Sequence, residues 1–218
     1  QQDRALRLFK ALQRGWVMDL WRSGWRDFLL GLGVLIFVGA ARAAAAQDLP
    51  LANPGLDGAA GEVPRGWVVG PSGALRNGFS VGLSELGPHD GDASVHIAWS
   101  DHQTPAARST VSLSQAVDAR SLRGQRVRFR AAVRSVRDGD NHVGLWMRVD
   151  RVSGEPGFFD NMSDRSIRDQ NWTYYDVTGD VARDAVRLNV GFLITGNGEA
   201  YFDSASLEVI GAADAEVE

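Results

Sequence analysis

The chain has 218 residues, of which 44% are hydrophobic and 23% charged, a composition typical of a globular protein rather than a disordered one. Its net charge of −4 conceals an asymmetry: seven Arg and Lys stand against three Asp up to Ala46, and sixteen against 24 Asp and Glu from Gln47 onward. The second part, with a net charge of −8, is unsuited to binding phosphate backbones, so the sequence argues against a nucleic-acid partner. Because the chain contains no cysteine, disulfides and thiolate metal sites are excluded.

Residues 1–24 are predicted to form a cytoplasmic or interfacial amphipathic helix. Apolar side chains recur at steps of three and four residues, and basic side chains occupy the remaining surface. This pattern favours a helix that lies on an anionic lipid surface. Trp16, Trp21 and Trp25 are expected at the membrane interface, because tryptophan prefers the level of the lipid headgroups.

Residues 25–46 contain an apolar run in which fourteen uncharged residues extend from Phe28 to Ala41. If this segment is helical, it spans roughly 33 Å and forms a single transmembrane anchor. Arg22 and Arg26 then place the N-terminus in the cytoplasm, so the chain sits in the inner membrane and its C-terminal domain faces the periplasm. The alternative is a secretory signal peptide that is cleaved after Ala46.

Residues 47–76 are rich in proline and glycine and are interpreted as a linker that runs into the edge of a domain. Residues 77–218 contain short segments in which apolar and polar side chains alternate, which is the pattern of half-buried strands. Strands are predicted at 93–99, 110–117, 126–134, 142–151, 172–178, 186–195 and 199–210. The predicted fold class is therefore all-β, an antiparallel jelly-roll β-sandwich preceded by the two helices. Residues 195–198 (Thr-Gly-Asn-Gly) are predicted to form a hairpin turn.

Several stretches of the chain resemble a known type of module. They are NPGLDG and PRGW between Asn53 and Trp67, SLRGQRVRFRAAVRS, VGLWMRVD, FDNMSDRSI, NWTYYDV, and VGFLITGNGEAYFDSASLEV. Together they resemble the bacterial jelly-roll modules of the carbohydrate-binding, galactose-binding-like type, over about the last 165 residues. The resemblance implies a binding or docking unit without catalysis of its own.

The predicted strand 142–151 carries the strongest candidate for a ligand site. Trp146, Arg148 and Asp150 alternate with apolar residues and therefore share one face. An aromatic ring, a guanidinium and a carboxylate in register suit a sugar ring. Trp172 and Tyr174 alternate in the same way and are candidates to complete the platform. The competing interpretation is that the tryptophans are covered by neighbouring chain and that Arg148 and Asp150 pair with each other.

Two further groups of charged residues are candidate sites. Asp160 and Asp164, with Asn161 beside them in a polar turn, and Asp203 in the last strand are oxygen donors that suit a structural calcium ion. The competing interpretation is that Asp and Asn are ordinary turn formers. No other cofactor is predicted. Four arginines alternate along one strand and are expected to be neutralised by carboxylates across the sheet or to dock an acidic partner; they are Arg126, Arg128, Arg130 and Arg134.

No catalytic residue is assigned, because the sequence contains none of the common catalytic motifs. The favoured function is a non-catalytic, membrane-anchored periplasmic accessory subunit. It would dock on and stabilise a larger integral membrane complex, with a respiratory or photosynthetic complex as a natural host. The alternative is a secreted carbohydrate-binding module whose signal peptide is removed. A glycan-active enzyme is a third hypothesis, without a motif to support it.

Overall fold

The computed structural model describes residues 47–72, 74, 78–100, 109–136 and 141–214. The helices predicted at 1–24 and 25–46, with Trp16, Trp21 and Trp25, lie outside the described residues. Within the described ranges, no helix has the length and apolar character needed to cross a bilayer.

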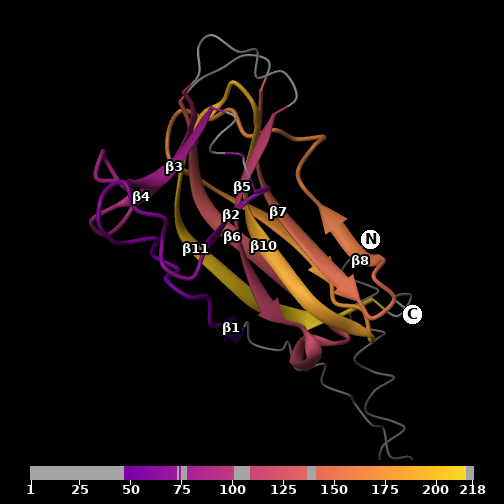
Figure 1. The fold of residues 1–218 in the computed structure, drawn as a ribbon. Coiled ribbons are helices and arrows are strands. Elements are labelled where there is room, and N and C mark those ends of the chain that lie inside the picture. The colour runs from indigo at the N-terminus through magenta and orange to yellow at the C-terminus, as the bar shows by residue number, and fades with distance from the viewer. Residues whose placement is uncertain (1–46, 73, 75–77, 101–108, 137–140, 215–218) are drawn as a thin grey trace, which may run out of the picture. The chain divides into compact units, whose positions relative to one another are not determined.

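The described residues form eleven strands in two sheets in which every pair is antiparallel (Figure 1). Sheet A has the order β3 (Phe79–Ser84), β4 (Ser94–Trp99), β11 (Glu199–Ala212), β6 (Gln125–Ser135) and β9 (Thr173–Asp180), with β1 (Gln47–Leu49) paired to β11. Sheet B has the order β2 (Val68–Gly70), β5 (Thr110–Asp118), β10 (Ala185–Gly196), β7 (Asn141–Arg151) and β8 (Pro156–Asp160). A short 3-10 helix, η2 (Arg120–Leu122), follows β5. The two-sheet sandwich and the seven predicted strands are confirmed, with strand ends displaced by at most two residues.

The core lies between the two sheets and is built by strict alternation along the strands. On β7, Val143, Leu145, Met147 and Val149 are completely buried, as the apolar pattern predicted. The ring of Phe192 lies near the centre of this core, stacked on Phe202 at 4.7 Å between centroids and on Trp67 at 5.2 Å. Because these rings come from β10, β11 and the segment before β2, one aromatic cluster joins both sheets.

The segment interpreted as a linker contributes to the sandwich. Trp67 is only 5% exposed, and its indole Nε1 donates to the carbonyl oxygen of Ala52 at 3.0 Å. The side-chain amide of Gln115 on β5 both accepts from the Ala52 N–H at 2.7 Å and donates to its carbonyl at 3.0 Å. Leu51 and Leu56 are buried as well. The described part of this segment thus belongs to the domain core, because Leu51, Leu56 and Trp67 lie between its proline and glycine turns and are buried.

The turn predicted at 195–198 joins two strands that do not pair with each other. β10 belongs to sheet B and β11 to sheet A, so the chain crosses from one sheet to the other instead of forming a hairpin. The Trp99 N–H donates to the carbonyl of Gly198 at 3.0 Å, and the Gly196 N–H donates to the carbonyl of Ser109 at 2.9 Å. These bonds tie the crossover to β4 and to the residue before β5.

Candidate ligand-binding face

The outer face of sheet B is formed by the side chains of β5, β10 and β7 that point away from sheet A. On β7, Trp146 and Asp150 are half-buried and Arg148 is exposed, while the residues between them are buried in the core. The prediction that Trp146, Arg148 and Asp150 share one solvent-facing side is therefore confirmed. Two residues along a strand advance about 7 Å, so the three side chains span about 13 Å along β7.

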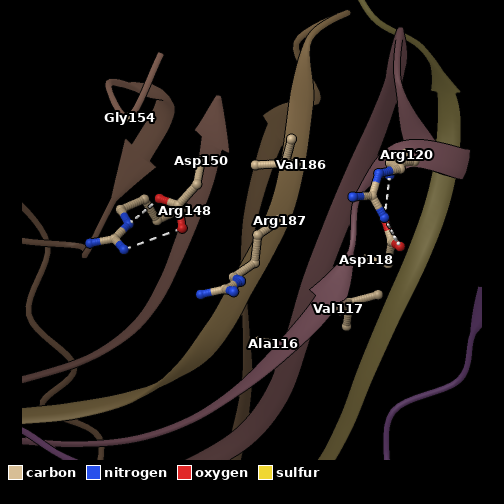
Figure 2. Close-up of a pocket in the computed structure, with 9 residues that line it drawn as sticks. All are labelled: Ala116, Val117, Asp118, Arg120, Arg148, Asp150, Gly154, Val186 and Arg187. Atoms are coloured by element: carbon tan, nitrogen blue, oxygen red, sulfur yellow. Dashed lines mark hydrogen bonds and ion pairs between the residues drawn. The ribbon is translucent and has the colours of Figure 1, made fainter. Parts of the chain in front are cut away.

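A groove of about 620 Å³ lies over one end of this face. Its lining residues come from three neighbouring strands and from the turns at their ends (Figure 2); they are Ala116, Val117, Asp118, Arg120, Arg148, Asp150, Gly154, Val186 and Arg187. Trp146 lies one pair of residues further along β7, next to the groove on the same face. The groove is thus a polar depression, and Trp146 follows it along β7 on the same outer face.

Arg148 and Asp150 form one fixed polar pair in the groove. The Arg148 Nε donates to Asp150 Oδ1 at 2.7 Å, and its terminal nitrogen donates to Oδ2 at 3.3 Å. The side-chain amide of Asn189 on β10 donates to the same Oδ2 at 2.8 Å. The pairing anticipated in the competing interpretation is confirmed, and it holds the guanidinium and the carboxylate side by side at the surface.

Asp118 and Arg120 form a second pair at the end of β5. Asp118 accepts from the Arg120 backbone N–H and from its guanidinium, both at 2.9 Å. The backbone hydrogen bond from Arg120, aided by the guanidinium charge, holds the pKa of Asp118 below its ordinary value. This carboxylate therefore stays ionised at neutral pH.

Arg187 lies on β10 between these two pairs, as Figure 2 shows. Arg187 is in register with Asp118 on β5 and with Asp150 on β7. Each of these carboxylates is bound to another arginine, and Arg187 makes no ion pair with any residue the structure describes. The sequence analysis did not single out Arg187 or Asn189. The apolar alternation of residues 188–194 could have placed both on the outer face.

Trp146 borders the groove in a partly enclosed position. Its partner across the sheet is Gly191, which has no side chain to cover the indole. The indole Nε1 is buried and has no acceptor among the described residues. Since nitrogen is the single heteroatom of the ring, the part of the indole that reaches the surface is carbon.

Phe159 on β8 is a second aromatic residue on this face, and the sequence analysis missed it. It is paired with Arg148 in register and is 55% exposed. Its neighbour Phe158 packs against the core, so the alternation of β8 turns Phe159 outward. A five-residue strand that begins at a proline gave too weak a pattern to be recognised from sequence.

Trp172 and Tyr174 do not complete the platform with Trp146. Tyr174 lies on β9 and Trp172 directly precedes it, at the edge of sheet A, whereas Trp146 belongs to sheet B. The Trp172 Nε1 donates to the carbonyl of Gly87 at 3.1 Å, and both rings contact the imidazole of His89. The expectation of one platform is wrong, because the two strands present their polar residues on opposite outer faces of the sandwich.

The oxygen donors considered for calcium are not brought together. Asp160 and Asp164 bind the guanidinium of Arg165, whereas Asp203 is completely buried in β11 of the other sheet. Asp203 accepts backbone N–H groups of His89 at 2.8 Å and of Asp90 at 3.1 Å. Burial nevertheless raises the pKa of Asp203 above its ordinary value. In the described ranges no three His, Asp or Glu side chains form a group that could hold a metal ion.

The four arginines that alternate along β6 are neutralised in part by carboxylates, as expected. Arg126 binds Asp180 at 2.8 Å and Asp214 at 2.7 Å, and Arg128 binds Glu208 at 2.9 Å. The other two arginines lie over aromatic rings instead: the guanidinium carbon of Arg130 is 4.2 Å from the Tyr174 ring centroid, and that of Arg134 is 4.0 Å from the Tyr201 centroid. Each of these four guanidinium groups therefore has a carboxylate or an aromatic ring beside it.

Comparison with known proteins gives one relative by sequence and a clear fold. No protein-family model matches the chain. It is 29% identical over 148 residues to an uncharacterized HTH-type transcriptional regulator of Bacillus subtilis, YbfP; the match covers 67% of this chain and spans about half, 48%, of that relative.

Two solved structures of Clostridium thermocellum Xyn10B share the fold. One is its C-terminal family 22 carbohydrate-binding module, matched with a TM-score of 0.50 and 16% identity over 68% of this chain and 89% of that chain. The other contains the CBM22-1 and GH10 modules complexed with xylohexaose, with a TM-score of 0.50, 12% identity, and coverage of 67% of this chain and 26% of that chain. Over about two thirds of its length the chain therefore has the two-sheet antiparallel fold of carbohydrate-binding modules, which confirms at the level of fold the resemblance predicted from the sequence.

Proposed function

We propose that the sandwich is a non-catalytic carbohydrate-binding module and that the outer face of sheet B binds the glycan. The observation that carries the proposal is the groove in which the Arg148–Asp150 pair lies beside the exposed carbon surface of Trp146. The fold of family 22 modules supports it. This reading is the alternative from the sequence analysis rather than its favoured one.

The chemistry of the face suits a sugar. A guanidinium donates hydrogen bonds to hydroxyl oxygens and a carboxylate accepts them from hydroxyl hydrogens, so Arg148 and Asp150 offer both functions side by side. The apolar C–H surface of a pyranose can pack on the indole of Trp146, and Phe159 offers a second exposed ring next to Arg148. Because Asp150 is held by both Arg148 and Asn189, its carboxylate is oriented before a ligand arrives.

The groove is poorly arranged for glycoside cleavage. That reaction needs one carboxyl group that stays protonated near neutral pH and a second that is ionised. Asp118 and Asp150, the two carboxylates that line the groove, are each bound to an arginine, and the pKa of Asp118 is lowered rather than raised. The site therefore supports binding rather than hydrolysis.

The proposal is tested by measuring the binding of the purified full-length chain to a panel of plant and bacterial polysaccharides by affinity electrophoresis. We expect retardation by at least one polysaccharide, and loss of it in Trp146→Ala and in Arg148→Gln. Arg148 is exposed, so its substitution leaves the core untouched and separates lost binding from lost folding. Failure of the wild-type chain to bind any polysaccharide would overturn the proposal.

A second proposal concerns location and is supported by the apolar run of residues 25–46. We infer that this segment carries the sandwich to the periplasmic side of the inner membrane. If it is retained there, the module acts as an anchored accessory unit of a membrane complex; if it is cleaved, the module is secreted. The mature N-terminus, determined by mass spectrometry, separates these outcomes, and a chain recovered from the cytosol with residue 1 intact would contradict both.

A further inference from the structure

We infer that the ligand of the sheet B groove is an acidic glycan, whose carboxylate is bound by Arg187. This inference rests on the proposed function and names the class of sugar that the site selects. It follows from the balance of charges that line the groove, from the register of β10, and from the geometry of the guanidinium group.

The groove holds an excess of positive charge within an acidic domain. Its lining contains three guanidinium groups and two carboxylates, those of Arg120, Arg148, Arg187, Asp118 and Asp150. The part of the chain from Gln47 onward carries a net charge of −8. A local excess of one cation in such a domain is the opposite of what the overall charge favours, and an anionic ligand would balance it.

The excess charge belongs to Arg187. This residue is in register with Asp118 on β5 and with Asp150 on β7, the two positions from which a carboxylate would normally neutralise it. Asp118 is held by Arg120 and Asp150 by Arg148, at 2.9 and 2.7 Å. Arg187 is exposed and has no hydrogen-bond partner in the described part of the chain. Its donors therefore remain available in the middle of the groove.

The ligand group that fits best is a carboxylate. A guanidinium presents parallel N–H groups that match the two oxygens of a carboxylate, which gives both strength and orientation. A carboxylate bound there would lie between the two arginine–aspartate pairs, within reach of sugar hydroxyls bound to Arg148 and Asp150. A uronic acid unit within a chain of sugars supplies both the carboxylate and the hydroxyls.

The test compares acidic oligosaccharides with their uncharged methyl esters. Oligomers of galacturonic, mannuronic and glucuronic acid units are titrated into the full-length chain by calorimetry, and each is then replaced by its fully methyl-esterified form. We expect at least one acid form to bind about tenfold or more tightly than its ester, with an affinity that falls as salt is added.

Variants then assign this preference to one side chain. Arg187→Gln is expected to lower the affinity for the acid form about tenfold or more, so that acid and ester bind with similar affinity, and Arg187→Lys to restore part of the preference, because lysine keeps the charge but loses the fork. Arg65→Gln is the matched control, since Arg65 is an exposed arginine that does not line the groove. Thermal unfolding of each variant verifies that the fold is kept.

Three other results would each contradict the acidic ligand, the assignment to Arg187, or both proposals. Equal affinity for acid and ester, or binding of neutral oligosaccharides alone, overturns the acidic ligand but leaves the carbohydrate-binding function standing. A preference that Arg65→Gln weakens as much as Arg187→Gln shows general charge attraction and also overturns the assignment to Arg187. Binding of no oligosaccharide, charged or neutral, overturns both proposals.

Discussion

Gly191 on β10 is the direct cross-strand partner of Trp146 on β7, and its position cannot accept a side chain. A Cβ atom built there would lie 2.2 Å from the carbonyl oxygen of Leu113, which belongs to the backbone of β5. The absence of a side chain at this point lets the backbone of β5 lie close to β10, directly opposite the strand that carries Trp146.

This contact predicts that Gly191→Ala destabilises the sandwich by about 1–3 kcal/mol, because the backbone of β5 or β10 must shift to make room. Urea denaturation followed by tryptophan fluorescence measures the difference. Gly211→Ala on β11 is the control, since a Cβ at Gly211 meets nothing within 4 Å. Equal stabilities for the two variants would contradict the packing described.

Trp172→Ala is expected to leave glycan affinity unchanged, because Trp172 lies beside sheet A and not on the outer face of sheet B. It should lower stability by about 1–2 kcal/mol through loss of the hydrogen bond to Gly87 and of the contact with the Arg134 guanidinium. Binding and thermal unfolding measured on the same sample separate the two effects. Loss of binding with unchanged stability would restore a platform shared with Trp146.

Trp67→Ala is expected to lower the free energy of unfolding by about 3–5 kcal/mol, since it removes a buried ring stacked on Phe192. Trp67→Phe keeps an aromatic ring and should cost less, mainly through loss of the hydrogen bond to Ala52. Chemical denaturation of both variants makes the comparison. A negligible effect of Trp67→Ala would show that residues 47–72 act as a detachable linker.

The lowered pKa of Asp160 predicts that the fold loses part of its stability in acid. Burial opposes its ionisation, but hydrogen bonds from the Arg165 guanidinium and the Met162 N–H outweigh burial and lower its pKa below 3.8. The stabilisation is therefore fully present above pH 3.8 and is lost as the pH falls through the lowered pKa. Asp160→Asn should reduce the melting temperature at pH 7 and flatten its decline below pH 4. An unchanged acid profile would show that Asp160 makes no net contribution.

The raised pKa of Tyr175 predicts that the fold loses stability when this tyrosine ionises at alkaline pH. Burial, reinforced by the neighbouring Asp169 carboxylate that accepts a hydrogen bond from the phenol hydroxyl, raises the pKa of Tyr175 to about 12. Because the fold favours the neutral phenol, its stabilisation is complete below pH 10 and is lost as the pH rises towards about 12. An ultraviolet titration should show one tyrosine ionising near pH 12, and Tyr175→Phe should remove that step. A titration curve unaltered by the substitution would contradict the assignment.

The sequence predicted what is local to a strand. Alternation along residues 142–151 placed Trp146, Arg148 and Asp150 on the outer side, because the pleat turns successive side chains to opposite faces. What alternation does not contain is which strand lies beside which. The position of Arg187 beside both Asp118 and Asp150 depends on a register between segments more than thirty residues apart in the chain.

The errors have the same physical origin. Trp172 and Trp146 follow the same local pattern, and sheet membership, which separates them, is decided by long-range pairing. Trp67 and Leu56 lie among prolines and glycines that mask their apolar spacing, so a segment that reaches the core had the composition of a linker. Short elements such as β1, β2 and β8 contain too few residues to display a period.

The attachment of β1 has a mechanical consequence. Its three residues, Gln47 to Leu49, pair with Leu207 to Val209 on β11, on the edge that β4 occupies further along the same strand. Tension arriving from the residues ahead of Gln47 acts first on this short ladder, which can peel away while the pairing of β11 with β4 and β6 persists. Release of these three residues would lengthen the tether by about 10 Å without separating the two sheets.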